Sequence, residues 1–174
     1  MSDVQETVST ERSHTFTWQD PTIGANVART MSGLEYLRAM MNGEFPFAPI
    51  GSLMNMHGAE VEEGRVVFVA EPAEYHYNPI GTVHGGFAAT LLDSALGCSV
   101  HSMLPAGTAY TTLEIKVNYL RPITAKTGTM YCEGKVVHMG GRVATAEARL
   151  TDASGKLYAH GTTTCIILRP DRTS

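Results

Sequence analysis

The first regular hydrophobic pattern in the chain has the period of a helix. Apolar residues recur at spacings of three and four, at Leu34, Leu37 and Met41. Ser32 is placed to cap the first turn, and Gly43 is placed to end the helix. The pattern predicts a short amphipathic helix over residues 33–43.

A second stretch, residues 83–104, is apolar almost throughout and contains no proline before Pro105. A helix that is apolar on every side is a buried one, so this stretch predicts a long central helix. It contains Asp93, which is the only Asp, Glu, Lys or Arg between Tyr75 and Leu113. A buried carboxylate is costly, so we expect Asp93 to be either a hydrogen-bonded structural acid or a reactive one.

The rest of the pattern favours strands, because short apolar runs are separated by turn signals such as Met139–Gly141 and Asp152–Gly155. We expect six strands, over residues 54–62, 64–71, 109–120, 128–138, 142–151 and 156–168. This order predicts an α+β fold in which an antiparallel β-sheet wraps around one long central α-helix. Because a sheet covers only part of such a helix, we expect a partner subunit to cover the remainder.

Composition excludes several classes of function. A chain of 174 residues with 43% hydrophobic and 17% charged residues has the make-up of a single globular domain. A net charge of −4 without a Lys/Arg run argues against nucleic-acid binding. Three isolated cysteines, without a C-x-x-C pair, favour reduced thiols over disulfides or a zinc site. The first thirty residues lack a signal-peptide pattern and no stretch suggests a membrane span, so we expect a cytoplasmic protein without a membrane partner.

An ordered set of motifs resembles a known family. The segment Asn78–Asp93 contains an Asn, a His-Gly-Gly six residues later and the Asp, and residues 111–122 form a strand pattern ending in Tyr-x-x-Pro. Over residues 45–168 the chain resembles the hotdog-fold acyl-CoA thioesterases of the phenylacetic acid degradation (PaaI) type. The resemblance implies a hotdog domain, which we place at residues 31–174, after an N-terminal extension at 1–30.

The resemblance also implies residue roles. It implies that the Gly85 N–H polarises the thioester carbonyl and that Asp93 acts as general base or as nucleophile. By the same resemblance Asn78 and Thr112 position water and the carboxylate, and His84 shapes the loop. The family forms dimers, often paired into tetramers, with active sites between protomers.

Helix geometry agrees with a shared site. Gly85 lies near a helix N-terminus, where free N–H groups and a partial positive charge favour an oxyanion. Asp93 is eight residues further along, or roughly 12 Å at the α-helical rise. That distance is too long for both groups to act on one carbonyl carbon, so we expect the Asp from the neighbouring chain.

The resemblance implies that the substrate is an acyl-CoA with a small, medium or aromatic acyl group. Coenzyme A is part of that substrate, and we expect no separate cofactor and no metal. For the coenzyme A phosphates we expect Arg142 first and then Arg121, because guanidinium groups bind phosphate well. Lys116 is more easily explained as a solvated charge. Four residues are candidates for the acyl pocket: Phe47, Ile50, Met54 and Leu91.

Other readings remain. Without the family, Gly85 and Gly86 fit a tight helix start, His84 a structural histidine and Asp93 a backbone-bonded acid. A non-catalytic acyl-CoA-binding module or a hotdog 3-hydroxyacyl thioester dehydratase are alternative functions. No G-x-S-x-G or H-E-x-x-H motif supports serine-hydrolase or zinc-protease chemistry.

Overall fold

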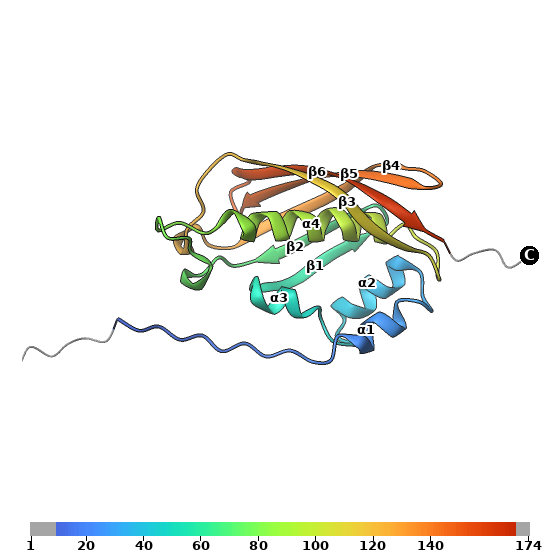
Figure 1. Cartoon of the computed structure of the whole chain (residues 1–174), viewed down its shortest axis with the longest axis horizontal. Coiled ribbons are helices and arrows are strands. Elements are labelled where there is room, and N and C mark those ends of the chain that lie inside the picture. The colour runs from blue at the N-terminus through green and yellow to red at the C-terminus, as the bar shows by residue number, and fades with distance from the viewer. Residues whose placement is uncertain (1–9, 170–174) are drawn as a thin grey trace, which may run out of the picture.

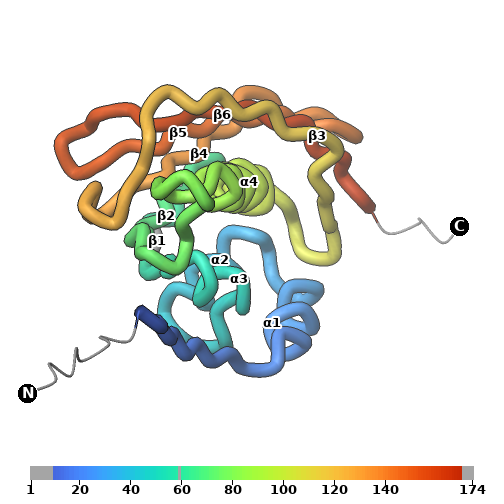
Figure 2. Tube along the Cα trace, turned by 60° about the vertical axis from the view of Figure 1, so that its left-hand side comes forward, coloured from blue at the N-terminus to red at the C-terminus, as the bar shows by residue number. Residues whose placement is uncertain are grey.

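The computed structural model describes residues 10–169 as one six-stranded antiparallel sheet and several helices. The ends of the expected extension and domain, 1–9 and 170–174, lie outside the described residues. The helices are α1 (Thr22–Val27), α2 (Gly33–Met41), α3 (Pro49–Leu53) and α4 (Gly85–His101), with 3-10 turns η1 (Glu74–His76) and η2 (Ala125–Thr127). The strands are β1 (Met56–Glu62), β2 (Arg65–Ala70), β3 (Ala109–Tyr119), β4 (Met130–Met139), β5 (Val143–Asp152) and β6 (Leu157–Leu168). These elements form three layers, with α4 between the sheet and the N-terminal helices (Figures 1 and 2).

The sheet confirms the predicted hotdog arrangement. Its strand order is β1-β2-β4-β5-β6-β3, and every neighbouring pair is antiparallel. All six expected strands form, each within two residues of its predicted start and end. Alternating burial along β4 and β5 directs one set of side chains towards α4 and the other outwards. Among the strands of residues 10–169, β3 pairs only with β6 and therefore forms an edge of the sheet.

Helix α4 lies against the inner face of the sheet, as expected for the central helix (Figure 1). The two backbones meet at Gly134 of β4, where a Cβ atom would lie 2.2 Å from the carbonyl oxygen of Ala95. A larger residue at position 134 would therefore push the helix off the sheet. The buried side chains of α4 include Phe87, Leu91, Leu92, Leu96 and Val100.

The opposite side of α4 corrects two expectations. Part of it is covered by the chain's own N-terminal layer: a Cβ at Gly33 of α2 would lie 1.7 Å from the carbonyl oxygen of His101. A partner subunit is therefore not needed over that part. Asp93 was expected to be buried, but it is exposed in the single chain. Its carboxylate reaches the β3 edge of the sheet, where the Thr112 hydroxyl donates to it.

The N-terminal helices were only partly predicted. Helix α2 is confirmed, with a capping box between Ser32 and Glu35, and it ends at Met41. Helices α1 and α3 were not predicted, because each is six residues or shorter and has no repeating apolar face. Pro49 starts α3, since proline suits the first helical position. In the part of the chain described here, no helix is long and apolar enough to cross a membrane.

Candidate active site

The N-terminus of α4 presents one free backbone donor. The His84 imidazole caps the helix, because its Nδ1 accepts a 2.8 Å hydrogen bond from the Gly86 N–H. The Phe87 N–H donates to the His84 carbonyl at 3.0 Å. Within residues 10–169 no acceptor takes the Gly85 N–H. The first turn of α4 therefore leaves Gly85 available to a ligand, at the positive end of the helix dipole.

Gly86 is required for this cap. A Cβ at Gly86 would lie 2.9 Å from Nδ1 of His84 and would displace the imidazole. Because Nδ1 accepts a hydrogen bond, it carries no proton in this arrangement. His84 thus caps the first turn of α4 with its side chain.

The loop before His84 is a turn built by Asn78. The Asn78 carboxamide oxygen accepts hydrogen bonds from the N–H groups of Ile80 and Thr82, at 3.1 and 3.2 Å. Its amide nitrogen donates to the Thr82 hydroxyl at 3.0 Å. Asn78 lies in the loop that leads to Gly85, and most of its hydrogen-bonding capacity holds that loop in place.

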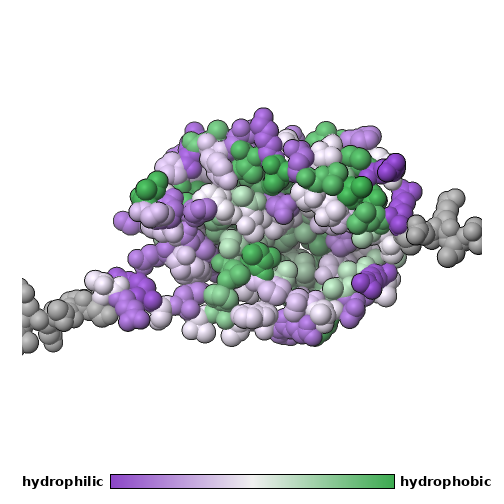
Figure 3. All heavy atoms as spheres, viewed as in Figure 1, coloured by the Kyte–Doolittle hydropathy of each residue, from purple (hydrophilic) through white to green (hydrophobic). Residues whose placement is uncertain are grey.

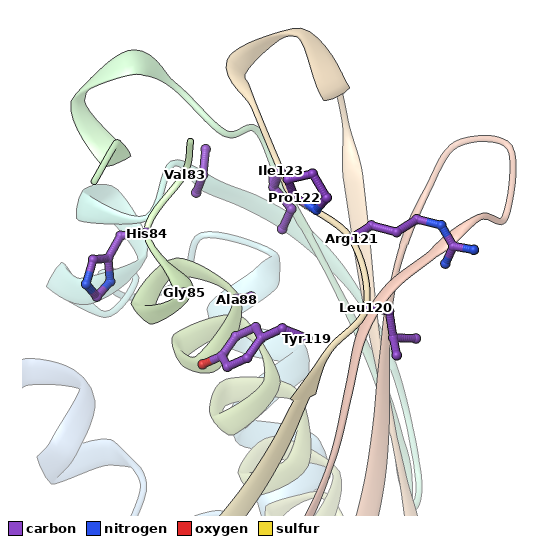
Figure 4. A pocket seen from close by; sticks show the side chains of 9 residues that line it. All are labelled: Val83, His84, Gly85, Ala88, Tyr119, Leu120, Arg121, Pro122 and Ile123. Carbon is purple, nitrogen blue, oxygen red and sulfur yellow. The ribbon is translucent and has the colours of Figure 1, made fainter. Parts of the chain in front are cut away.

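A cavity of about 380 Å³ opens beside Gly85 (Figure 4). We call it the donor cavity; its lining residues are Val83, His84, Gly85, Ala88, Tyr119, Leu120, Arg121, Pro122 and Ile123. Figure 4 shows the Tyr119 ring reaching from the end of β3 across the start of α4. A Cβ at Gly85 would lie 3.2 Å from this ring, so the missing side chain lets Tyr119 pack against the donor. No role for Tyr119 follows from the sequence, although it is the Tyr of the Tyr-x-x-Pro signature.

The second group of site residues surrounds Asp93. The Thr112 hydroxyl of β3 donates to Asp93 Oδ1 at 3.2 Å. Thr112 lies next to a register irregularity in the β3–β6 ladder, and such bulges reorient side chains near functional sites. No ion pair reaches Asp93 from the described residues.

Asp93 and Thr112 line a second cavity, of about 210 Å³, which we call the acyl chamber. Its walls are mostly apolar and come from α2, the α2–α3 loop, α3, β1, β2, α4 and β3: Met40, Phe47, Ala48, Ile50, Gly51, Met56, Phe68, Ser94, Gly97, Cys98 and Tyr110. Apolar residues gather in a hollow between the sheet and the N-terminal helices (Figure 3). Two of the four expected pocket residues, Phe47 and Ile50, line the chamber; Met54 and Leu91 do not.

The chain therefore holds two half-sites on one helix. Asn78, His84 and Gly85 lie at the N-terminal end of α4, and Asp93 and Thr112 lie together two turns further on. The two groups line different cavities. The structure brings together the members of each group but does not bring the groups to one point within a single chain.

Comparison with known proteins identifies the family. The sequence profile described as "Thioesterase superfamily" matches residues 80–159. Acyl-coenzyme A thioesterase 13 from Homo sapiens is 30% identical over 138 residues, which cover 76% of this chain and 91% of that protein. The chain belongs to the thioesterase superfamily.

Two further proteins are similar to this thioesterase. A protein of Halobacterium salinarum, named for an inferred esterase activity, is 44% identical over 69 residues; the match covers 38% of this chain and less than half, 44%, of that protein. The crystal structure of a phenylacetic acid degradation-related protein from Ralstonia eutropha JMP134 superposes with a TM-score of 0.68. It is 25% identical and the match covers 75% of this chain and 98% of that one. The predicted family, hotdog fold and enzyme class, a thioester hydrolase, are thereby confirmed.

Two groups beside Asp93 stay protonated in this thioesterase. Burial, and then the Asp93 charge, raise the pKa of the Cys98 thiol to about 12. Burial also raises the pKa of Tyr110 well above its usual value. The chamber therefore offers no thiolate nucleophile at neutral pH, because the thiolate is the reactive form of cysteine.

His76 is a structural link between α3 and the start of α4. Its Nε2 donates to the Leu53 carbonyl at the end of α3, at 2.8 Å, and its Nδ1 accepts from the Ala73 N–H at 3.0 Å. Its own carbonyl accepts from the His84 N–H at 2.8 Å. One buried residue thus connects an element of the acyl chamber with the cap of α4. The spacing of His76 two residues before Asn78 gave no signal of this, because both contacts depend on the fold.

The expected phosphate-binding arginines lie apart. The Arg142 carbonyl accepts from the Ile167 N–H near the start of β3, whereas Arg121 follows the end of β3. Nine residues of strand separate these ends, or roughly 30 Å. In Figure 4 the Arg121 side chain points away from α4, and its guanidinium donates to the Leu157 carbonyl. Both arginines are exposed, but one chain does not bring them to one phosphate group.

Proposed function

We propose that this thioesterase hydrolyses acyl-CoA with a small, medium or aromatic acyl group, and that each active site is built from two protomers. The observation that carries the proposal is the division of chemical groups along α4. A free Gly85 N–H lies beside one cavity, and a carboxylate held by a hydroxyl lies at the mouth of an apolar chamber. Thioester hydrolysis needs both groups at one carbonyl.

A second protomer supplies the missing half. The two groups are eight residues apart on one helix, which corresponds to roughly 12 Å. The free edge of β3 supports pairing with a second β3, because it carries unpaired backbone groups and the exposed side chains Leu113, Tyr119 and Leu120. Antiparallel pairing of two such edges directs the Tyr119 end of one strand towards the Tyr110 end of the other. That arrangement brings Gly85 of one chain towards Asp93 of its partner, in a dimer or a dimer of dimers.

In this site Gly85 N–H and the helix dipole polarise the thioester carbonyl. The partner's Asp93 then takes a proton from water as the water oxygen attacks the carbonyl carbon, and the tetrahedral intermediate collapses with loss of the coenzyme A thiolate. As a nucleophile, Asp93 would instead attack the carbonyl carbon and expel the coenzyme A thiolate, and water would then hydrolyse the resulting mixed anhydride to the free acid and the Asp93 carboxylate. Thr112 orients the carboxylate in both cases, and Asn78 and His84 hold the donor loop.

The acyl group lies in the acyl chamber and coenzyme A extends outwards. A chamber of about 210 Å³ is smaller than the roughly 300–1,000 Å³ of pockets for drug-sized ligands, which favours a small or medium acyl group. We propose Arg121 of one chain and Arg142 of the other for the coenzyme A phosphates, because antiparallel pairing of the β3 edges would bring the Tyr119 end of one strand beside the Tyr110 end of the other. The names of the human acyl-CoA thioesterase and of the phenylacetic acid degradation-related protein support this substrate class.

Release of free thiol from a panel of short, medium, long-chain and aromatic acyl-CoAs tests the proposal. Wild type should hydrolyse members of the panel, and Asp93→Asn and Asp93→Ala should lower kcat about 10²- to 10⁴-fold, the usual contribution of a general base. Both variants should keep the wild-type melting temperature and oligomeric state, because Asp93 is exposed and makes no ion pair among residues 10–169. Wild-type rates in a folded Asp93 variant would refute the assigned role. Tight acyl-CoA binding by wild type without turnover would favour the binding module.

A further inference from the structure

The acyl chamber shares one wall with a second cavity. That cavity, of about 400 Å³, lies beneath the segment that precedes α1, and we call it the arm groove; its lining residues are Thr17, Trp18, Gln19, Pro46, Phe47 and Ser52. Of the described residues, Phe47 alone lines both the chamber and the groove. Phe47 therefore lies between the two cavities.

The position of this ring depends on its contacts. A Cβ at Gly51 of α3 would lie 2.0 Å from Cε1 of Phe47, so the ring rests on the bare backbone of Gly51. On its other side Phe47 meets the Phe68 ring edge to face, with centroids 6.4 Å apart. Phe47 lies in the loop between α2 and α3 and is only half-buried. A rotamer change towards solvent would move the ring without disturbing a helix or strand, and partly exposed side chains make such changes rapidly.

We propose that Phe47 is a gate that sets the length of the acyl group. With the ring on Gly51, the chamber ends at Phe47 and accepts small and medium groups. When the ring swings outwards, the chamber continues into the arm groove, where a longer alkyl chain packs under Trp18. The Trp18 side chain is suited to this contact, because it is 62% exposed and gains burial only when the groove is filled. This inference rests on the proposed acyl-CoA hydrolysis and adds its chain-length limit.

The gate predicts how truncation at Phe47 changes substrate choice. For Phe47→Ala we expect the ratio of kcat/KM for palmitoyl-CoA to kcat/KM for hexanoyl-CoA to rise at least tenfold over wild type, measured along a saturated series from butanoyl- to palmitoyl-CoA. Each methylene newly buried against Trp18 and Pro46 contributes at most about fourfold, from the transfer free energy of a CH₂ group, because Thr17, Gln19 and Ser52 make the rest of the groove polar. Adding Trp18→Ala to Phe47→Ala should remove part of the gain for the longest chains only.

Phe45→Ala is the matched control, because it makes the same truncation in the same loop but lines neither cavity. Its chain-length profile should equal that of wild type. Phe47→Leu provides a milder variant if Phe47→Ala melts much earlier, and its profile should shift in the same direction. An unchanged profile in a folded Phe47 variant would overturn the gate.

Binding separates failure of the gate from failure of the proposed function. The affinities of non-hydrolysable thioether analogues, measured by calorimetry over the same chain lengths, should show the same shift in Phe47→Ala. If wild type hydrolyses no acyl-CoA, the hydrolytic function fails, while the shift in analogue affinity still supports the gate. Suppose instead that wild type hydrolyses short acyl-CoAs, while turnover and analogue affinity depend on acyl-chain length in Phe47→Ala as they do in wild type. Only the gate then fails.

Discussion

Three consecutive residues at the start of α4 produce a single free donor. His84 supplies a side-chain acceptor and a carbonyl, which engage the N–H groups of Gly86 and Phe87. Gly86 leaves room for the imidazole, and Gly85 leaves room for Tyr119. Each glycine is thus explained by a close approach of a specific ring rather than by an unusual backbone angle. Because the donor is the backbone N–H of Gly85, a test of its role needs a substitution that removes the N–H without moving the backbone.

Two substitutions at Gly85 distinguish the effect of losing the N–H from the effect of adding a side chain. Proline lacks the N–H, suits the first position of a helix, and requires an extended residue before it. His84 already has φ −61° and ψ 140°. We expect Gly85→Pro to lower kcat about 10²- to 10³-fold, the usual loss for one oxyanion donor. Gly85→Ala adds a comparable Cβ against Tyr119 but keeps the N–H.

Steady-state kinetics of both variants, together with their melting temperatures, check this prediction. Gly85→Ala should retain much more activity than Gly85→Pro. Equal losses in the two variants would show that crowding of Tyr119, and not the missing N–H, is responsible.

At the scale of elements, the acyl chamber and the donor loop are joined through η1. His76 bonds the last residue of α3, the residue before η1 and, through its carbonyl, the cap of α4. The Tyr77–Val83 bridge and the hydrogen bond from the Ala125 N–H to the Tyr77 hydroxyl close the same loop. The elements that carry the two halves of the site are thus held by one network around a neutral imidazole.

This network predicts a pH-dependent stability. Burial, and more weakly the charge of His14, lower the pKa of His76 below its ordinary 6.5 in the folded state, against a hydrogen bond to Leu53 that raises it. The unfolded chain takes up a proton near pH 6.5 while the folded chain does not. The contribution of neutral His76 to the free energy of unfolding is therefore complete above pH 6.5. It is lost as the pH falls towards the folded-state pKa, and the free energy of unfolding then decreases by no more than about 1.4 kcal/mol per pH unit.

Denaturant unfolding of wild type and His76→Gln between pH 8 and pH 5 measures this contribution. Glutamine keeps a donor for the Leu53 carbonyl but does not titrate. The stability of wild type should fall more steeply below about pH 6.5 than that of the variant. His101, whose pKa is also lowered by burial, is present in both proteins and cancels in the difference. Parallel curves would mean that His76 does not hold a neutral imidazole in the fold.

At the scale of the whole molecule, the sheet and the central helix could be predicted because their patterns are local. The alternating pattern of β4 and β5 can be recognised within a short run of consecutive residues, and so can the apolar run of α4. The acyl chamber could not be predicted in the same way. Its walls come from segments between Met40 and Thr112 that only the fold brings together.

The candidate site was predicted to a similar extent. The ordered motif placed Asn78, His84 and Gly85 in one loop, and the hydroxyl of Thr112 does meet Asp93. The exposure of Asp93 was missed, because an apolar sequence around it does not say which side of the helix the sheet covers. Tyr119 and His76 act through contacts with residues distant in sequence, Gly85 and Leu53, and the Phe47 ring meets Phe68 in the same way. The pairing of protomers and the phosphate contacts of Arg121 and Arg142 stay predictions.

The central claim is that one active site takes Gly85 from one chain and Asp93 from another, and mixed oligomers test it most directly. Gly85→Pro and Asp93→Asn should each be nearly inactive alone. Unfolded and refolded together in equal amounts, they should recover about a quarter of wild-type specific activity, because half of randomly assorted dimers are mixed and each mixed dimer holds one intact site of two. If the mixture, shown to contain mixed dimers, stays as inactive as its components, the site lies within one chain and the account is wrong.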